Sequence, residues 1–218
     1  MPAPDGPVRV LAVCTGNICR SPATERLLAA ALGVAHRGAA PLGGVEVGSA
    51  GTRALVGYAM TDEMAALVAA DGASPAGFTA RRLTADLVAQ ADLVLALTRA
   101  HRSEVVALQP AAVRRTFTLR ELARLVAGAR PDEVRATGPD VATRLVALPE
   151  LLAPRRRAAH RPDDDDVVDP YGRGAATYLE SHVAICAAVR ALADAVRDPE
   201  PAPVPGPVPA PVPAAPAS

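Results

Sequence analysis

The residues best suited to covalent chemistry lie near the start of the chain, in the run Cys14-Thr15-Gly16-Asn17-Ile18-Cys19-Arg20-Ser21-Pro22. A cysteine thiolate is a strong nucleophile, and a guanidinium can hold two oxygens of a phosphoryl group in its planar fork. Five residues separate Cys14 from Arg20, so one short loop could place the sulfur beneath a phosphoryl group that Arg20 holds. A bare Cys-x5-Arg spacing fits a buried thiol at a strand end equally well, but the nine-residue run is far more specific. It predicts a phosphate-binding loop in which Ser21 donates a hydrogen bond to the thiolate.

The sequence around this run predicts how the loop is positioned. Residues 8–13 are apolar, rich in valine and bounded by proline and glycine, as in a buried strand of a parallel sheet. Gly16 and Asn17 are the residue types that best adopt positive φ, and Pro22 suits the first turn of a helix reaching about Leu32. The loop amides would then converge above a helix N-terminus, which is an anion-binding arrangement that also favours a thiolate.

A second candidate for chemistry is the tripeptide Asp169-Pro170-Tyr171. The proline biases Asp169 towards an extended backbone, which helps to hold a carboxyl group out over a pocket. Taken alone, an Asp-Pro pair is more typical of an ordinary turn. Its interpretation as a catalytic element depends on the loop at Cys14.

Together these motifs resemble the low-molecular-weight protein tyrosine phosphatases. That family combines a Cys-x-Gly-Asn-x-Cys-Arg-Ser-Pro loop with a distant Asp-Pro-aromatic motif, and the segment from Ser49 to Thr52 is also similar to the family's. The resemblance covers residues 8–127 and 167–197. It implies hydrolysis of phosphotyrosine or related aryl phosphomonoesters through a phosphocysteine, without cofactor or metal. Asp169 would be general acid and then base. Cys14, Arg20 and Asp169 would be catalytic, Ser49 and Tyr171 supporting, and the phosphate-binding residues would be Thr15, Gly16, Asn17, Ile18, Cys19 and Ser21.

The chain also departs from the family pattern. Phe78 stands where the family usually has a histidine that braces the loop asparagine, which would leave Asn17 to Ser49 alone or to water. The aromatic wall usually offered to the substrate ring would here come from Leu55 or Tyr58.

Three other functions fit the same loop. Related arsenate reductases need two further cysteines, whereas Cys186 is the only other thiol in the chain. Arginine phosphatases of the same fold carry a threonine where this chain has Ile18. A phosphoanion-binding module with little turnover is the third alternative, and Phe78 is the feature that favours it.

The remaining pattern predicts an α/β fold with a four-stranded parallel sheet, helices on both faces and the phosphate-binding loop after strand 1. The other strands are expected at residues 45–49, 92–97 and 115–119, and the other helices at about 61–70, 98–108, 140–152 and 173–197, with a helical turn at 83–89. On the last helix, Cys186 lies on an apolar stripe and is expected to be a core thiol.

Composition divides the chain into a domain and two tails. We expect an N-terminal tail at residues 1–7, a phosphatase domain at 8–197 with an insertion at 128–166, and a proline-rich disordered tail at 198–218. The insertion carries an arginine run and an aspartate run, which favour a solvated excursion over a lid above Asp169. The tail has nine prolines in 21 residues and no flanking basic residue, which favours a passive tail over a ligand for a partner.

Charge and cysteine content suggest where such a protein works. The 23 arginines balance 23 acidic residues, so the net charge predicts neither a nucleic-acid nor a membrane partner. The expected partner is a phosphotyrosine-containing protein or a small aryl phosphate. Two of the three cysteines lie in the loop and no signal-peptide pattern is present, which favours a reducing cytoplasm. Cys19 could protect an oxidised Cys14 by forming a disulfide with it.

Overall fold

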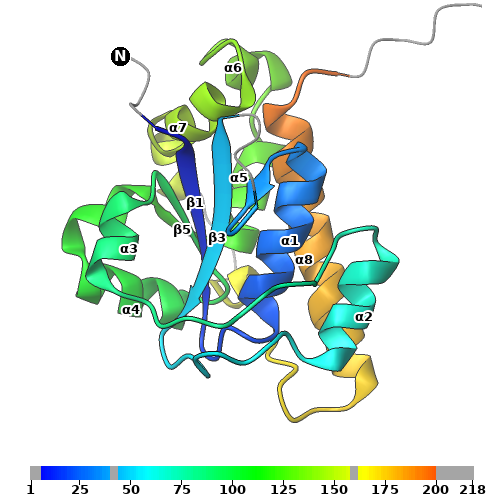
Figure 1. Cartoon of the computed structure of the whole chain (residues 1–218). Coiled ribbons are helices and arrows are strands. Elements are labelled where there is room, and N and C mark those ends of the chain that lie inside the picture. Colours follow the sequence, from blue (N-terminus) through cyan, green and yellow to red (C-terminus); the bar gives the residue numbers. More distant parts are fainter. Residues whose placement is uncertain (1–5, 40–43, 158–161, 200–218) are drawn as a thin grey trace, which may run out of the picture.

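The core of the protein is one parallel β-sheet whose strands run in the order β2-β3-β1-β4-β5 (Figure 1). The computed structural model describes residues 6–39, 44–157 and 162–199. The strands are β1 (Val8–Cys14), β2 (Ala35–His36), β3 (Val45–Gly51), β4 (Leu93–Ala96) and β5 (Thr116–Thr118). Because β1 pairs with both β3 and β4, the order in which strands are added to the sheet reverses at β1. Ligands of such sheets bind beyond the carboxyl ends of the strands at this point.

The predicted fold class is confirmed, with one correction to the number of strands. The sheet has five strands where the sequence predicted four, because β2 adds a short edge strand beside β3. Ala35 and His36 form only two residues of ladder, which is too short to show an alternation of apolar and polar residues.

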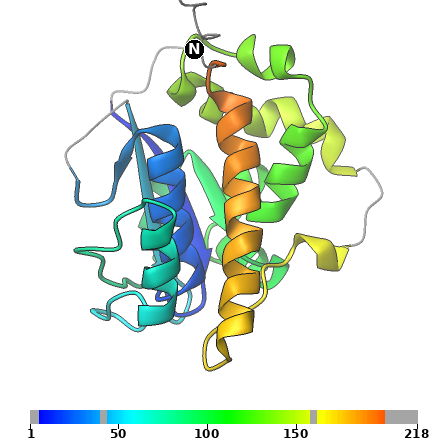
Figure 2. The same cartoon turned by 90° about the vertical axis from the view of Figure 1, so that its right-hand side faces the viewer.

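Helices cover both faces of the sheet because β1 is apolar on both sides. Val8, Val10 and Ala12 point into the larger part of the core, whereas Leu11 and Val13 point into the smaller part. The larger part contains α1 (Arg20–Leu32), α2 (Asp62–Ala70), α5 (Leu119–Ala127) and α8 (Ala175–Val196) (Figures 1 and 2). The smaller part contains α3 (Ala85–Gln90), α4 (Arg99–Leu108) and the 3-10 helix η1 (Pro110–Arg115).

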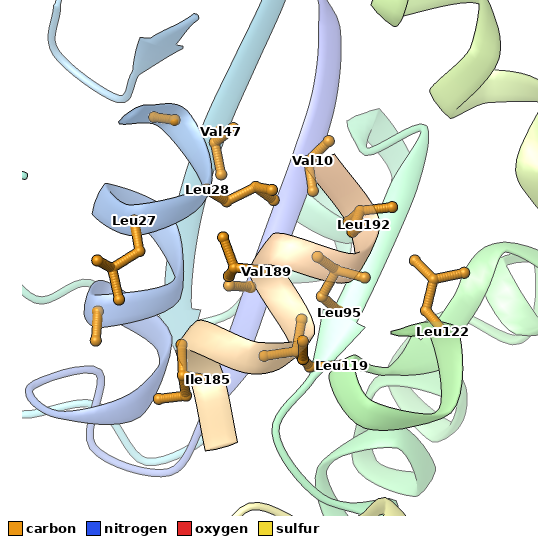
Figure 3. Packing of buried hydrophobic residues seen from close by; sticks show 14 of the residues in the cluster. Val10, Leu27, Leu28, Val47, Leu95, Leu119, Leu122, Ile185, Val189 and Leu192 are labelled. Atoms are coloured by element: carbon orange, nitrogen blue, oxygen red, sulfur yellow. The ribbon is translucent and has the colours of Figure 1, made fainter. Parts of the chain in front are cut away.

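Helix α8 fixes the position of α1 against the sheet. Its side chains Ile185, Val189 and Leu192 belong to the same buried cluster as the sheet residues Val10 and Leu95 (Figure 3). All five are almost completely buried. Full burial of side chains of this size contributes about 1.5–3 kcal/mol each, so this layer stabilises the helix that begins at the candidate loop.

Part of the predicted insertion packs into the core. It contains α6 (Pro131–Arg135), α7 (Val141–Leu152) and the 3-10 helices η2 (Ala153–Arg157) and η3 (Pro162–Asp165). The buried leucines of α7 are Leu145, Leu148 and Leu152. Ala142 approaches Gly44, just before β3, so α7 lies at the opposite end of the sheet from Cys14 and is no lid over the loop (Figure 1).

The charged runs of this segment are also paired, contrary to the expected solvated excursion. Asp165 is buried and pairs with Arg124 at 3.2 Å. Arg156 pairs with Glu121 at 3.0 Å and lies over the ring of Phe117. These contacts bring the chain back to the strand ends ahead of Asp169.

Some predictions concern residues outside the described ranges. Residues 1–5 of the predicted N-terminal tail, residues 158–161 of the insertion and residues 200–218 of the proline-rich tail lie outside the described ranges. The prediction that this tail is passive and binds no partner concerns the last of these segments. Within the described ranges, no helix combines the length and the apolar character needed to cross a lipid bilayer.

Candidate active site

The segment that follows β3 holds the loop between β1 and α1 by hydrogen bonds to the loop's carbonyl groups. The N–H groups of Thr52, Arg53 and Leu55 donate to the carbonyl oxygens of residues 14, 15 and 16 at 2.9–3.0 Å, and Thr61 N–H donates to that of residue 18 at 2.9 Å. A Cβ atom on Gly51 would lie 2.5 Å from the Thr15 carbonyl oxygen, so only glycine allows this approach. The segment after β3 therefore fixes the orientation of the loop peptides.

The loop N–H groups face the other way. Among the described residues, those of positions 15–19 make no hydrogen bond, and α1 begins at Arg20 without a side-chain cap. Asn17 has a φ of 55°, the one positive φ of a described non-glycine residue, and this conformation turns successive N–H groups towards a common centre. The loop thus offers unpaired amides at a helix N-terminus, as an anion-binding site does.

Asn17 is braced on both ends of its side-chain amide. Its Nδ2 donates to Ser21 Oγ and to Ser49 Oγ, each at 2.9 Å, and its Oδ1 accepts from the N–H of Arg81 at 2.9 Å. Asn17 therefore has more partners than the expected Ser49 or water. Phe78 instead packs in the core with Arg26 and Arg37 each 5.7 Å from its ring centre.

Cys14 and Arg20 line the same pocket, at the two ends of the loop. The Cys14 Sγ lies 3.0 Å from Ser21 Oγ, which is the predicted hydrogen bond. Arg20 is buried, and its Nη1 donates to the carbonyl of Val167 at 3.1 Å. Its Nη2 forms an ion pair with Asp169 Oδ2 at 2.5 Å. Thus the structure brings together both predicted motifs, although 148 residues separate Arg20 from Asp169.

Short contacts hold Asp169 above the loop. The N–H of Val167 donates to the carbonyl of Leu97 at the end of β4 at 2.9 Å, and Asp166 Oδ1 accepts from the N–H of Arg99 at 2.7 Å. Tyr171 N–H donates to Asp169 Oδ1 at 3.2 Å, which orients the carboxylate. The Asp169 side chain is nevertheless half exposed, so it can turn from Arg20 towards a bound group.

These groups line a pocket of about 200 Å³. The predicted residues on its wall are Cys14, Thr15, Gly16, Ile18, Cys19, Arg20, Asp169 and Tyr171. Asn17, Ser21 and Ser49 do not line it but are fully buried behind the loop. Leu55 lines the pocket as expected, whereas Tyr58 is exposed and does not. Arg53 also lines the pocket, and the sequence reasoning missed it because no pattern distinguishes it from other surface arginines.

His101 is a second residue that the sequence reasoning missed. Its Nε2 lies 2.8 Å from Thr15 Oγ1 and its Nδ1 lies 2.8 Å from Thr98 Oγ1, so the ring braces the loop from α4. Burial, with the charge of Arg20 as a smaller cause, lowers the pKa of His101 to about 4. The imidazole is therefore neutral at pH 7. A histidine in the first turn after a capping threonine was the available signal.

Glu25 is the third missed residue. It is fully buried in α1 and its Oε2 accepts a hydrogen bond from Ser49 Oγ at 2.6 Å, which orients the serine towards Asn17. Burial raises the pKa of Glu25, and the hydrogen bond from Ser49 and the charge of Arg26 oppose this shift. Its signal in the sequence was an acidic residue on the face of a helix expected to be buried.

Cys19 lies on the other side of the loop, against α8. Its Sγ is 3.6 Å from Thr61 Oγ1 and 3.9 Å from Tyr178 Oη. Burial raises the pKa of the Cys19 thiol. Thr61 precedes α2, but its side chain makes no capping hydrogen bond there and contacts Cys19 instead.

Chemically, the arrangement can bind a tetrahedral dianion against the loop amides and Arg20. The Cys14 sulfur then lies below that anion and the Asp169 carboxyl group above it. The described part of the pocket contains no cluster of metal-ligating side chains.

Comparison with known proteins gives a family match. The family model for low molecular weight phosphotyrosine protein phosphatase matches residues 9–134. Etp of Escherichia coli K12, named a low molecular weight protein-tyrosine-phosphatase, is 41% identical over 101 residues, which are 46% of this chain and 62% of Etp. EpsP of Ralstonia nicotianae, named a probable enzyme of this type, is 36% identical over 113 residues, 52% of this chain and 71% of EpsP. The match therefore spans less than two thirds of the first of these relatives.

Solved structures agree on the fold. The tyrosine phosphatase AmsI of Erwinia amylovora superposes with a TM-score of 0.61 at 23% identity, over 87% of this chain and 93% of AmsI. The YwlE arginine phosphatase of Geobacillus stearothermophilus gives 0.59 at 27% identity, over 86% of this chain and 91% of YwlE.

Proposed function

This chain belongs to the low molecular weight phosphotyrosine protein phosphatase family, and from this we propose that it hydrolyses phosphotyrosine in proteins, or related aryl phosphomonoesters, through a phosphocysteine. One observation carries the proposal: Arg20 joins Asp169 at 2.5 Å in the same pocket that holds the Cys14 sulfur. We assign Cys14 as the nucleophile, Arg20 as the phosphate ligand and Asp169 as the general acid and base.

In the first step, the Cys14 thiolate attacks phosphorus and the aryl oxygen leaves. Ser21 Oγ, 3.0 Å from the sulfur, stabilises the thiolate by a hydrogen bond. The loop amides and Arg20 neutralise the equatorial phosphoryl oxygens. They need no rearrangement during the reaction because the carbonyls of the loop are already bonded to residues 52–61.

Asp169 supplies the proton for the leaving group. In the free enzyme the Asp169 carboxylate forms an ion pair with Arg20. An incoming phosphoryl group binds the guanidinium in its place, so the carboxyl group is free to turn towards the departing oxygen. The bound dianion also favours the protonated carboxyl group, since it places further negative charge nearby. In the second step the same carboxylate takes a proton from the water that attacks the phosphocysteine.

The pocket wall favours an aryl over a guanidinium leaving group. Ile18 and Leu55 give it apolar side chains, and Tyr171 adds an aromatic ring at its rim. Such a wall stabilises a phenyl ring by apolar contact. Arginine phosphatase activity is the second candidate, because YwlE, which has the same fold, is named an arginine phosphatase. It ranks second because Ile18 provides no hydroxyl to accept a hydrogen bond from a guanidinium N–H.

The test is phenol release by the full-length protein across aryl phosphates of different leaving-group pKa, in single turnover. Tyrosine has a phenol pKa of about 10 and leaves poorly without a proton, so Asp169→Asn should slow its release by roughly 10²–10⁴-fold. An activated phenol should be affected much less. Cys14→Ser should abolish release altogether.

Two results would contradict the proposal. Parallel leaving-group dependences for native protein and Asp169→Asn would return Asp169 to a structural role. Absence of turnover in native protein that binds vanadate would instead support a phosphoanion-binding module. Here the three partners of Asn17 favour turnover, since the loop is braced without a histidine at position 78.

A further inference from the structure

Three side chains outside the pocket converge where α2 ends against α8. Asp71 follows α2 directly, and His182 and Cys186 are four residues apart on α8, so they lie on one face of that helix. The potential ligand atoms of the three lie within 4.8 Å of one another. None of them lines the pocket at Cys14. The sequence did not predict the cluster, because Asp71 is more than a hundred residues away from its partners and Cys186 was expected to be a core thiol.

The distances show a single point of convergence. Asp71 Oδ2 lies 2.8 Å from His182 Nε2 and 3.0 Å from Cys186 Sγ, and that sulfur lies 3.3 Å from the same Nε2. A Cys-His-Asp relay for a nucleophile would use the two ring nitrogens separately, one for sulfur and one for the carboxylate. Here both contacts go to Nε2, so the geometry is that of a shared ligand centre.

The triangle is close to the size that zinc requires. Tetrahedral Zn²⁺ has bonds of about 2.3 Å to sulfur and 2.0–2.2 Å to nitrogen and oxygen, which gives ligand-to-ligand distances of roughly 3.3–3.6 Å. The observed distances are up to about half an ångström shorter, as expected for ligand atoms that share protons instead of a cation. Rotation of the half-exposed Asp71 side chain can open the triangle.

The charges balance when a divalent cation binds. Without metal the Cys186 thiol keeps its proton and donates it in the 3.0 Å hydrogen bond to Asp71 Oδ2. Metal binding forms the metal–sulfur bond and releases that proton to solvent, while the imidazole keeps one proton on Nδ1. One thiolate and one carboxylate then neutralise the two charges of the cation. Mixed sulfur, nitrogen and oxygen ligands suit Zn²⁺. They disfavour Ca²⁺ and Mg²⁺, which prefer oxygen ligands alone.

The fourth position is open to solvent. Asp71 and Cys186 line a groove of about 480 Å³ together with Gly72, Arg190 and Asp194. His182 is buried behind them, and among the described residues its Nδ1 has no hydrogen-bond partner. A missing partner on that nitrogen costs about 10–100-fold in affinity. The site is therefore a three-ligand site that takes a water molecule as its fourth ligand.

We propose that Asp71, His182 and Cys186 form a zinc-class metal site that joins α2 to α8. A metal there stabilises the folded chain by binding it in preference to the unfolded chain. The site is independent of phosphatase activity, so its test uses metal binding and not turnover.

The experiment uses the full chain with Cys14→Ser and Cys19→Ser, in which Cys186 is the only thiol. After removal of metal by a chelator, Co²⁺ should bind in a one-to-one ratio and give a thiolate-to-cobalt charge-transfer band. Zn²⁺ should displace it, release about one proton and raise the Tm.

Matched variants locate the site. On the same background, Asp71→Asn should weaken Zn²⁺ binding at least tenfold, and Cys186→Ser should remove the band and the Tm shift. Asp194→Asn, which changes a carboxylate in the same groove outside the triangle, should leave binding unchanged. Cobalt binding without a thiolate band overturns the proposal even if the Cys186→Ser protein fails to fold, as does an Asp194→Asn effect equal to that of Asp71→Asn.

Discussion

The pH dependence of stability should reveal the neutral, buried state of His101. Its pKa falls from 6.5 in the unfolded chain to about 4 in the folded protein. Between these values the unfolded chain binds more protons than the folded protein, so the free energy of unfolding must decrease as the pH falls through this range. The contribution is fully present above pH 6.5 and is lost towards pH 4.

The size of the effect follows from the two pKa values. Between pH 7.5 and 5.0 the difference in proton binding removes about 2 kcal/mol from the free energy of unfolding. His101→Gln keeps a hydrogen-bonding side chain that does not titrate. The native protein should therefore lose about 2 kcal/mol more than His101→Gln over this interval.

Urea denaturation of both proteins at the two pH values measures this difference. Comparing the losses in the two proteins cancels the contributions of the other titrating groups. One of these is Glu25, whose raised pKa acts in the opposite direction, because it makes the folded state more stable as the pH falls. Equal losses in the two proteins would refute the assignment of a neutral His101. The variant should also bind phosphate more weakly at pH 7.5, because His101 contacts Thr15 in the loop.

Three further outcomes follow from the contacts of the site. Arg20→Ala should lose both vanadate inhibition and turnover of aryl phosphates, because the guanidinium would contact the phosphoryl group in the ground state and in the transition state alike; retained vanadate inhibition would argue against this contact. After peroxide and then thiol treatment, native protein should regain turnover and Cys19→Ser should not, as measured by aryl phosphate hydrolysis, whereas equal recovery would exclude protection by Cys19. Phe78→Ala should lower the free energy of unfolding by about 3–5 kcal/mol in urea, against under 0.5 kcal/mol for the exposed Leu179→Ala, since Phe78 is buried and its ring centre lies 5.7 Å from the guanidinium carbons of Arg26 and Arg37; similar losses would mean that the core tolerates the cavity.

Local rules made the fold and the loop predictable. The apolar run of β1, the positive-φ residue Asn17 and the first-turn proline of α1 act through the backbone within a few residues, so the sequence alone located the loop and its helix. The distant aspartate was found only because a second motif resembled the same family. Burial of α7 was not predicted, because the charged runs after it resemble those of a solvated segment.

The tertiary structure decided how the loop is braced and what surrounds it. Asn17 gains its third partner from the backbone of Arg81, and a backbone donor leaves no trace in residue type. Arg53 lines the pocket and His101 contacts Thr15 of the loop, each from a segment far from Cys14 in the sequence. The convergence of Asp71 on Cys186 likewise depends on how α2 packs against α8. Sequence patterns report periodicity and local backbone preference, whereas contacts between distant segments arise only when the helices pack on the sheet.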